Sequence, residues 1–519
     1  MKLLKSTVTV SGATILSRIL GFVRDVVLAR LFGASGTTDA FFLAFRIPNL
    51  MRRMFAEGSF ALAFVPVLSE YRASGDRTAL RDLVDHVAGT LAAILLVVTA
   101  AGMLAAPAVM AVFAPGWLLE GRPEFALSAQ MLRITFPYIL LISLTALAGG
   151  ILNTFERFAL PALTPILLNL SLIGCAVLLS PQFDVPVKAL AWGVLLAGVL
   201  QLSVQIPALS RLGLLPRPRL GFNHPGVRRI LKLMVPTLIG SSAAQVNILF
   251  DSIIATFLVS GSVSWLYYSD RLLEFPLGVF GIALATVILP NLSRKHAQKS
   301  RAAFSRTLDW ALRLSMIITL PAAAGLVILA TPILITLFQY QAFQADDVAM
   351  SAMSLVAYAA GLPAFIAVKV LAPGFFARQD TRTPVKIGLI AMLANFIMNL
   401  LFVGAMVHWG MAGPHAGLAL ASSVSAFLNA GLLYRGLRRS GAYQPGAGWL
   451  RLTLTVLFAC LAMVAVLSRW TPDTEIWMAL TAGNRTMDLL LYIAFGASIY
   501  ALTAWIAGLR PRHLSHGPS

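Results

Sequence analysis

Long runs of apolar residues, separated by short polar segments, extend along almost the whole chain. Each run has about 20 residues or more, the length that an α-helix needs to cross the hydrocarbon core of a bilayer. The pattern predicts an all-α polytopic membrane protein with about fourteen transmembrane helices, at residues 7–32, 38–69, 86–113, 127–153, 159–180, 189–210, 233–258, 263–292, 307–339, 347–377, 384–407, 413–434, 452–468 and 487–509.

The composition excludes a soluble globular class. Apolar residues make up 58% of the chain and charged residues 12%, and the mean hydropathy is +0.82, far above the range of soluble domains. The first apolar run carries Arg18 and Arg24 and has no small-residue cleavage motif after it, so we expect it to be retained as a span. Cys175 and Cys460 both lie in apolar runs, which indicates neither a disulfide framework nor a metal site.

The net charge of +19 is distributed by side of the membrane. Most Lys and Arg outside the spans fall on the side of the N-terminus and the even-numbered connections. The opposite side has only four, Arg122, Lys188, Arg469 and Arg485. The positive-inside rule therefore places both termini in the cytoplasm. Charge placed in this way does not indicate nucleic-acid binding.

A basic, Pro-containing connection, residues 211–229, follows the sixth span. It indicates a solvated cytoplasmic linker held near anionic lipid, rather than a catalytic segment. The predicted division is an N-terminal lobe at 1–210, the linker at 211–232, a C-terminal lobe at 233–438 and two additional helices within 450–509. A gapless alignment of the segment from Phe41 with that from Trp265 supports a parallel repeat of two six-helix lobes, with any substrate site near the midplane between them.

Charged residues inside the first two spans need partners or water, because an Arg near the centre of a spanning helix costs roughly 2.5–3.5 kcal/mol on insertion scales. Arg18 and Arg24 lie about 9 Å apart along the axis of the first span. In the second span, Arg53 and Glu57 are four residues apart and can pair, which leaves Arg52 free to face a cavity.

The eighth span repeats this arrangement in the sequence SDRLLEFP. Asp270 and Glu274 share a helix face, Arg271 can reach Glu274 at a spacing of three, and Pro276 breaks the helix beside them. If the lobes meet around a cavity, these arginines form a cationic wall. Guanidinium groups bind phosphate or pyrophosphate oxygens in pairs and stay charged in a low dielectric.

The alternative is that the arginines only extend to the bilayer surface. That interpretation is favoured for Arg30 and Arg46, which are near span ends. For Arg18, Arg24, Arg52 and Arg271 the cavity is favoured, because intramembrane charge is expensive. We expect other charged residues nearby to set orientation and local neutrality: Asp25, Asp39 and Arg53.

Polar residues in two further spans allow two interpretations. Asp251 lies inside the seventh span with no basic residue within four positions, and Asn395 and Asn399 are four apart in the eleventh. They form a site for a coupling sodium ion or proton, or they make helix–helix hydrogen bonds with the Asp protonated. The hydrogen-bonding interpretation is slightly favoured.

The sequence does not show the acid, base or metal-binding residues outside the spans that a membrane-embedded enzyme usually needs. The loops on the non-cytoplasmic side are short, and no His or Cys cluster or exposed carboxylate pair stands out in them. We therefore expect no enzyme activity, no catalytic residue, no metal site and no organic cofactor.

The sequence closely resembles the MurJ/MviN family of lipid II flippases, within the multidrug/oligosaccharidyl-lipid/polysaccharide exporter superfamily. The resemblance rests on residues 17–71, on SDRLLEFPLGVFGIALATVILP from Ser269 and on GFFARQDTRTP from Gly374, and it covers nearly the whole chain. It implies two six-helix lobes around a central cationic cavity, with two further helices that form a groove for a lipid tail.

The resemblance also implies a function and a set of site residues. The implied function is transfer of undecaprenyl-pyrophosphate-linked peptidoglycan precursor, lipid II, from the cytoplasmic to the periplasmic leaflet of the bacterial inner membrane by alternating access. The family's substrate-contacting arginines match Arg18, Arg24, Arg52 and Arg271, and its supporting polar positions match Ser17, Asp39, Asp270 and Glu274.

Partners and energy source follow as expectations of the same kind. The partners are lipid II and membrane lipids, with the peptidoglycan synthesis machinery as a further candidate. A sodium ion, a proton or the membrane potential would drive transport. The alternative function is an ion-coupled exporter of drugs or polysaccharide lipids from the same superfamily, although cationic drugs would favour an acidic cavity.

Overall fold

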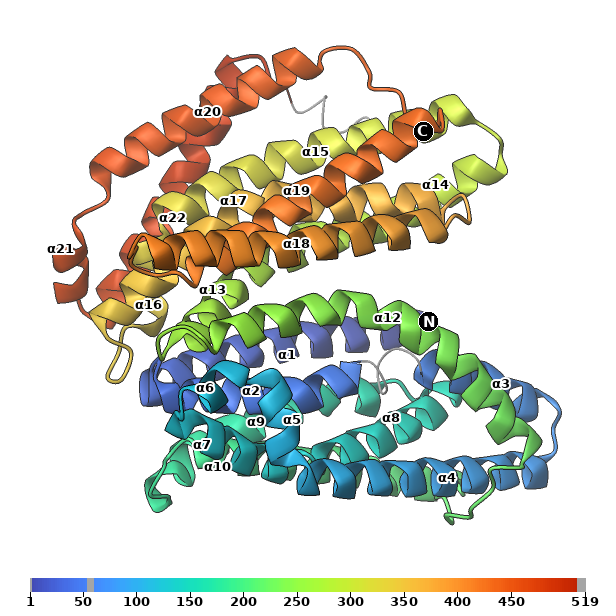
Figure 1. The fold of residues 1–519 in the computed structure, drawn as a ribbon. Helices are drawn as coiled ribbons and strands as arrows, with labels where there is room; N and C mark the ends of the chain where they lie inside the picture. Colours follow the sequence, from blue (N-terminus) through green and yellow to red (C-terminus); the bar gives the residue numbers. More distant parts are fainter. Residues whose placement is uncertain (1, 54–59, 511–519) are drawn as a thin grey trace. The chain divides into compact units, whose positions relative to one another are not determined.

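The computed structural model describes residues 2–53 and 60–510, and in these ranges the chain forms helices and no β-strand (Figure 1). This confirms the predicted all-α class. The chain divides into two compact units, Met1–Ser264 and Trp265–Ser519, and each is described separately.

Within its described residues, the first unit contains twelve α-helices. They are α1 (Lys2–Phe32), α2 (Gly36–Met51), α3 (Phe60–Ala73), α4 (Arg77–Leu104), α5 (Ala106–Phe113), α6 (Pro115–Leu119), α7 (Pro123–Thr135), α8 (Tyr138–Thr154), α9 (Ala159–Leu178), α10 (Lys188–Ser203), α11 (Ile206–Leu212) and α12 (Pro225–Ala255). Helix α1 packs along α9, and α9 packs on α10. Phe64, Leu83, Ile151 and Ile230 contribute to one buried apolar core that joins α3, α4, α8 and α12.

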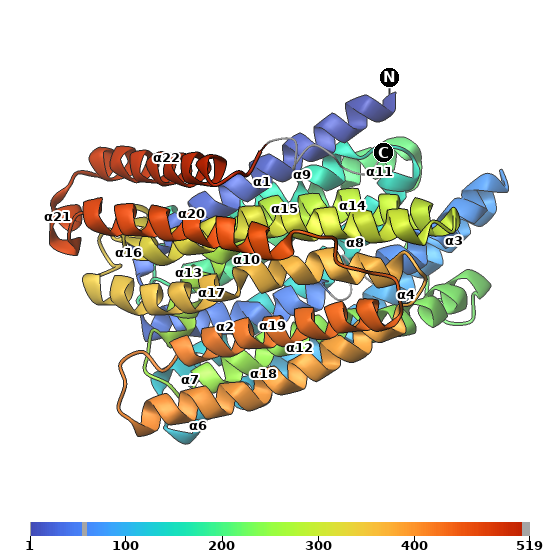
Figure 2. The ribbon, with the colours of Figure 1, turned by 90° about the horizontal axis from the view of Figure 1, so that it is seen from above.

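Helix α13 (Ser262–Pro276) begins three residues before the second unit and continues into it. The second unit then contains a π-helical segment (Leu277–Gly281), α14 (Ile282–Ala297), α15 (Arg301–Ile328), α16 (Ala330–Phe338), α17 (Ala345–Phe376), α18 (Arg382–His408), α19 (Ala416–Arg439), α20 (Trp449–Trp470), α21 (Thr474–Ala479) and α22 (Ala482–Ile506). Figure 2 shows the long helices of this unit side by side, in agreement with the packing of α17 on α15 and α19 and of α18 on α19.

Eleven helices in the described ranges are long and apolar enough to cross a membrane, so the predicted count of about fourteen is not confirmed. The other three predicted spans correspond to α1, the α2 and α3 pair, and α12, which are helical but are not among the eleven. Helix α1 carries Arg18, Arg24, Asp25 and Arg30, and residues 54–59 between α2 and α3 lie outside the described ranges.

The two units divide later in the chain than the predicted linker at 211–232. Helix α12, which begins inside the predicted linker, packs on α3, α4, α5 and α6 and therefore belongs to the first unit. The predicted boundaries of the lobes stay a prediction.

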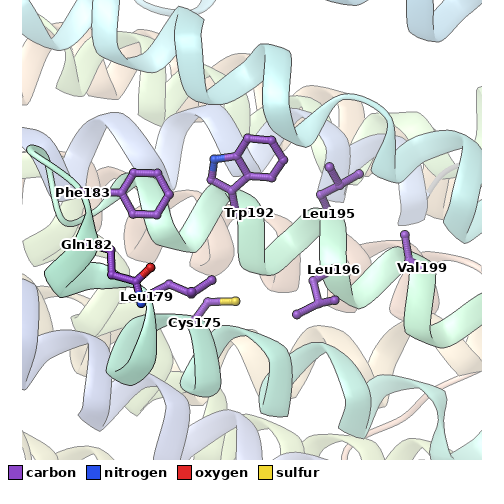
Figure 3. A pocket seen from close by; sticks show the side chains of 8 residues that line it. All are labelled: Cys175, Leu179, Gln182, Phe183, Trp192, Leu195, Leu196 and Val199. Atoms are coloured by element: carbon purple, nitrogen blue, oxygen red, sulfur yellow. The ribbon is translucent and has the colours of Figure 1, made fainter.

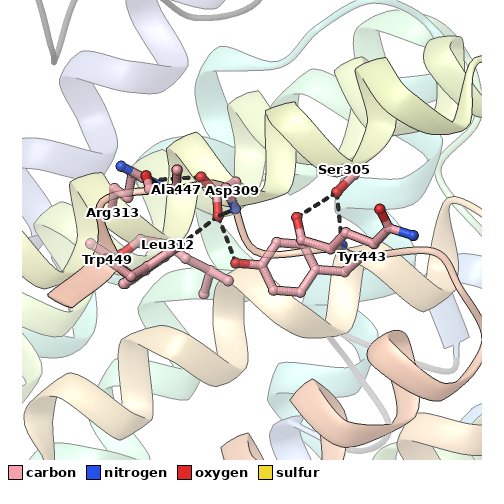
Figure 4. Close-up of polar contacts among 10 residues, drawn as sticks. Ser305, Asp309, Leu312, Arg313, Tyr443, Ala447 and Trp449 are labelled. Carbon is pink, nitrogen blue, oxygen red and sulfur yellow. Dashed lines mark hydrogen bonds and ion pairs between the residues drawn. The ribbon is translucent and has the colours of Figure 1, made fainter.

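The Asp309 carboxylate of α15 holds the segment that leads into α20, together with hydrogen bonds between Ser305 and Gln444 and from Arg313 to the carbonyl oxygen of Ala447 (Figure 4). Asp309 accepts hydrogen bonds from the Tyr443 hydroxyl at 2.7 Å, from Trp449 Nε1 at 2.7 Å and from the Gly446 amide at 3.2 Å. Arg313 Nε donates to its other oxygen at 2.7 Å. Burial and the hydrogen bond to Asp309 raise the pKa of Tyr443 above its usual range, so the hydroxyl remains a donor.

Helices α20 and α22 also pack directly on α15. Ile317 of α15, Val456 and Cys460 of α20, and Tyr500 of α22 form a small apolar cluster, and the Tyr500 hydroxyl donates to the carbonyl oxygen of Ile317 at 2.8 Å. The two additional helices predicted at the end of the chain are therefore attached to the second unit.

Candidate functional site

Arg24 of α1 is buried and held by two side chains of the first unit. Its Nη2 and Nε donate to Asp25 Oδ1 at 2.7 and 3.0 Å, and its Nη1 donates to Asn169 Oδ1 of α9 at 3.0 Å. Asp25 thus supplies the local neutrality that the sequence predicts. The guanidinium is fixed in one orientation between α1 and α9.

Asn169 is a residue that the sequence reasoning missed. Its Nδ2 donates to the carbonyl oxygen of Ser17 at 3.0 Å while its Oδ1 accepts from Arg24. Gly21 leaves room for this amide on α1, since an added Cβ there would lie 3.5 Å from Asn169 Nδ2. The one available signal was an amide inside the otherwise apolar run of α9.

Arg18 differs from Arg24. Its side chain is exposed, and it makes no hydrogen bond or ion pair within the described part of the chain. Ser17 beside it is half-buried and contributes its backbone carbonyl to the contact with Asn169.

Arg52 is not left free, contrary to the sequence interpretation. Its Nε and Nη2 donate to Asn49 Oδ1 at 3.1 and 2.9 Å, because the amide lies one turn earlier on the same side of α2. Arg53 is half-buried. Glu57, its predicted partner, lies outside the described residues.

In the second unit, Arg271 and Glu274 form the predicted ion pair, with 2.6 Å between Nη1 and Oε2. The Arg271 guanidinium also lies over the ring of Tyr267, 5.0 Å from its centroid. Helix α13 ends at Pro276, as the proline predicts, and the chain continues as the π-helical segment. Asp270 is exposed near this pair.

Asp39 holds the start of α13, and its hydrogen bonds among the described residues go to Gly261 and Ser264 rather than to an arginine. It is 2% exposed, and its carboxylate accepts from the amides of Gly261 and Ser264 at 2.7 and 2.8 Å and from the Ser264 hydroxyl at 2.5 Å. A carboxylate at these amides satisfies donors that a helix start leaves unpaired. Its position supports helix packing rather than neutralising a guanidinium.

Arg46 does not simply extend to the bilayer surface, as the sequence reasoning favoured. Its Nη1 donates to the hydroxyl of Ser252 on α12, so this guanidinium joins α2 to α12. Arg30, by contrast, is exposed at the end of α1.

The two asparagines of α18 contact each other. Asn399 Nδ2 donates to Asn395 Oδ1 at 3.2 Å, and Asn395 Nδ2 donates to Ser422 of α19 at 3.3 Å. Both residues are fully buried. The contact of Asn395 with Ser422 joins α18 to α19, as the favoured interpretation of helix–helix hydrogen bonding expects, whereas the contact between the two asparagines lies within α18. Asp251 lies in α12 of the first unit, and its participation in an ion site stays a prediction.

An apolar pocket of about 480 Å³ lies between α9 and α10 (Figure 3). Cys175, Phe183, Trp192 and Leu196 are among the side chains that line it, and none of its lining residues is charged. Such a surface suits a hydrocarbon chain and not an anion. The arginines therefore remain the candidates for the anionic part of a ligand.

A solved structure with the same architecture shows the fold class of this protein. The inward-facing conformation of a multidrug resistance MATE family transporter of the MOP superfamily is similar with a TM-score of 0.63 over 82% of this chain and 95% of that chain, at 15% identity. That likeness shows the fold, which is that of a polytopic membrane transporter.

Three further comparisons concern the family, and the relative and the family model identify it. The lipid II flippase MurJ in an inward closed conformation is similar with a TM-score of 0.78 and 26% identity, over 96% of this chain and 98% of that chain. A probable lipid II flippase MurJ of Vibrio cholerae is 46% identical over 99% of this chain and 98% of its own length. Residues 28–481 match the family described as lipid II flippase MurJ, and the chain belongs to this family.

Proposed function

We propose that this protein is a lipid II flippase that moves the undecaprenyl-pyrophosphate-linked peptidoglycan precursor from the cytoplasmic to the periplasmic leaflet of a bacterial inner membrane. One observation carries the proposal: membership of the MurJ family over nearly the full length, with relatives of that name at 46% and 44% identity. The residues of the site supply a physical reason for it.

The substrate carries a pyrophosphate, which guanidinium groups bind through paired N–H donors. Arg18, Arg24 and Arg52 come from the first unit and Arg271 from the second. In the proposed mechanism these groups bind the head group in a water-filled cavity while the lipid tail stays in the bilayer. Rocking of two lobes then exposes the head group to the other side.

Substitution of single arginines in a strain that depends on the protein tests this role. Arg24→Ala and Arg271→Ala should abolish growth while the protein still reaches the membrane, and lipid II should accumulate in the inner leaflet. Arg30→Ala is the matched control, because Arg30 is an exposed arginine at the end of the same helix as Arg24. Growth of both cavity variants, with normal lipid II distribution, would overturn the assignment.

Reconstitution distinguishes the flippase from its alternatives. Purified protein in liposomes should move lipid II from one leaflet to the other and leave the molecule chemically unchanged. Unchanged lipid II pools on depletion, together with lost drug efflux, would favour the multidrug exporter. Chemical conversion of lipid II by the purified protein would favour an enzyme.

Orientation and ion coupling belong to the same proposal. Both termini face the cytoplasm, which fusion of reporter enzymes to each end tests: activity of a periplasm-dependent reporter at either terminus refutes it. Asp251 takes part in binding a coupling cation, with Asn395 and Asn399 as further candidates. Sodium- or proton-dependent transport that survives Asp251→Asn refutes that role.

A further inference from the structure

The connection between α11 and α12 is tied down along the first half of α4. The amides of Arg217 and Arg219 donate to the side chain and the carbonyl of Asp85 at 2.7 and 3.1 Å, and the amide of Gly221 donates to the Thr90 hydroxyl at 3.1 Å. The connection approaches so closely that a Cβ at Gly89 would collide with the backbone of Arg219. These contacts fix the position of the residues that follow, up to the start of α12.

Three residues with metal-binding side chains meet where this connection ends. Asp82 and His86 are four residues apart on one face of α4, and His224 directly precedes α12. One ligand atom from each lies within 4.8 Å of the others. The two imidazole rings stack with 5.0 Å between centroids and 18° between planes. All three residues are partly buried, so a bound ion would be only partly hydrated.

Each histidine nitrogen lies at a ligand-like spacing from one of the two oxygens of the Asp82 carboxylate, and the three ligand atoms taken together lie within 4.8 Å of one another. His86 Nδ1 lies 3.3 Å from Asp82 Oδ1, and His224 Nε2 lies 3.3 Å from Asp82 Oδ2. Two ligand atoms at ~2.0–2.2 Å from a tetrahedral zinc ion are roughly 3.3–3.6 Å apart. An ordinary N–H···O hydrogen bond is shorter, at about 2.9–3.0 Å. We propose that Asp82, His86 and His224 form a site for a divalent transition-metal ion of the zinc type, with a fourth position open to water.

The local hydrogen bonds set a condition on binding. His224 Nδ1 accepts from the Gly226 amide at 3.1 Å and so caps α12, which in a neutral ring places the proton on Nε2, toward Asp82. His86 Nδ1 lies 2.8 Å from the carbonyl oxygen of Asp82. An ion bound through His224 Nε2 and His86 Nδ1 must take the place of the proton on each of these nitrogens, since a nitrogen that binds a metal must be unprotonated. In the neutral ring the proton of His224 then moves to Nδ1, which can no longer accept from the Gly226 amide. Metal binding therefore competes with this cap of α12, while it joins the start of α12 to α4.

Cobalt titration of the untagged, full-length protein in detergent tests the site. Co²⁺ reports tetrahedral N/O coordination by visible absorption, and Zn²⁺ displaces it. Because the sequence contains another histidine pair, His513 and His516, the titration is performed in a His513→Ala/His516→Ala background. We expect one Co²⁺ per chain, and a binding constant at least tenfold weaker in His86→Gln and in His224→Asn.

His224→Asn is the decisive variant, because Asn is a good helix cap but a poor ligand for zinc. The melting temperature of His224→Asn without metal should equal that of the parent, which would show that the fold is intact. His296→Ala, at a histidine in α14, is the matched control and should bind Co²⁺ as the parent does. Absence of tetrahedral cobalt binding in the parent, or binding that survives both ligand substitutions, would overturn the proposal.

Discussion

Substitution of Asp309 by Asn should release α20 locally while the rest of the fold stays intact. Four donors converge on this carboxylate: Arg313 Nε, the Tyr443 hydroxyl, Trp449 Nε1 and the Gly446 amide. Hydrogen bonds to charged groups contribute roughly 1.5–3 kcal/mol and neutral ones ~0.5–1.5. Asn retains one acceptor oxygen, but its NH₂ group is a donor and cannot accept the hydrogen bond that Arg313 Nε donates to Asp309.

The size of the effect follows from these contacts. If each of the four hydrogen bonds loses ~0.5–1 kcal/mol, the free energy that holds the segment to α15 falls by about 2–4 kcal/mol. Hydrogen bonds measured inside membrane proteins are weak, which supports the lower end of this range. A loss of about 2 kcal/mol raises the equilibrium constant for local opening roughly 30-fold. That change is large enough to measure by chemical labelling.

The two cysteines provide the assay. Cys460 of α20 is 8% exposed in the cluster with Ile317, and Cys175 of α9 is 3% exposed in the first unit. With Cys175 replaced by Ala, a thiol-reactive dye should label Cys460 roughly 30-fold faster in Asp309→Asn than in the parent. With Cys460 replaced, labelling of Cys175 should not change.

Asp346→Asn is the matched control, since Asp346 is an exposed carboxylate of the same unit. It should leave both labelling rates unaltered. Equal acceleration at both cysteines in Asp309→Asn would indicate global unfolding, and no acceleration at Cys460 would show that the carboxylate does not hold α20. Either result refutes the reasoning.

Three further substitutions have defined outcomes. Asp39→Asn keeps a single acceptor where the carboxylate serves two amides and a hydroxyl, so it should lower complementation of a depletion strain at normal membrane levels of protein. Gly361→Ala would place a Cβ 2.6 Å from a side-chain carbon of α19 and should destabilise by about 1–3 kcal/mol in thermal melts, whereas Gly388→Ala, with open space around it, should not. Asn169→Ala removes one support of Arg24 and should reduce lipid II transport in liposomes without loss of folding, a result that unchanged transport would contradict.

Contacts between residues close in sequence were predictable. The spacing of three between Arg271 and Glu274 predicts their ion pair, because residues three apart lie on neighbouring positions of a helix. Asp25 was expected to neutralise charge near Arg24, and it does. Hydropathy located most helices for the same reason, since a spanning helix is defined by its own composition.

Contacts across long stretches of sequence were not predictable. Asp39 binds Gly261 and Ser264, and Arg46 binds Ser252, in each case more than 200 residues away. Apolar periodicity determines which face of a helix is buried, but not which neighbour provides a donor there. An intramembrane charge therefore indicates that a partner exists without identifying it.

The two segments of the predicted repeat also share a feature of the backbone that hydrophobic periodicity does not predict. In the gapless alignment that places Phe41 on Trp265, Arg53 falls on Leu277. The backbone is π-helical at both positions, in residues 52–53 and in Leu277–Gly281. π-Helical turns are rare and are frequent at functional sites. The change in helical geometry falls at Arg52 in the first unit and begins six residues after Arg271, at Leu277, in the second.

The acids beside the arginines have a consequence for transport. Asp25 next to Arg24 and Glu274 next to Arg271 reduce the energy of holding a guanidinium inside the membrane when no substrate is bound. At the substrate site that we propose, these acids would also compete with a bound pyrophosphate, and a transporter needs this competition because it must release what it binds. Arg18, exposed and without a partner in the described part of the chain, can bind a phosphate oxygen without displacing a carboxylate. Affinity should therefore depend most on Arg18, while the paired arginines make release possible.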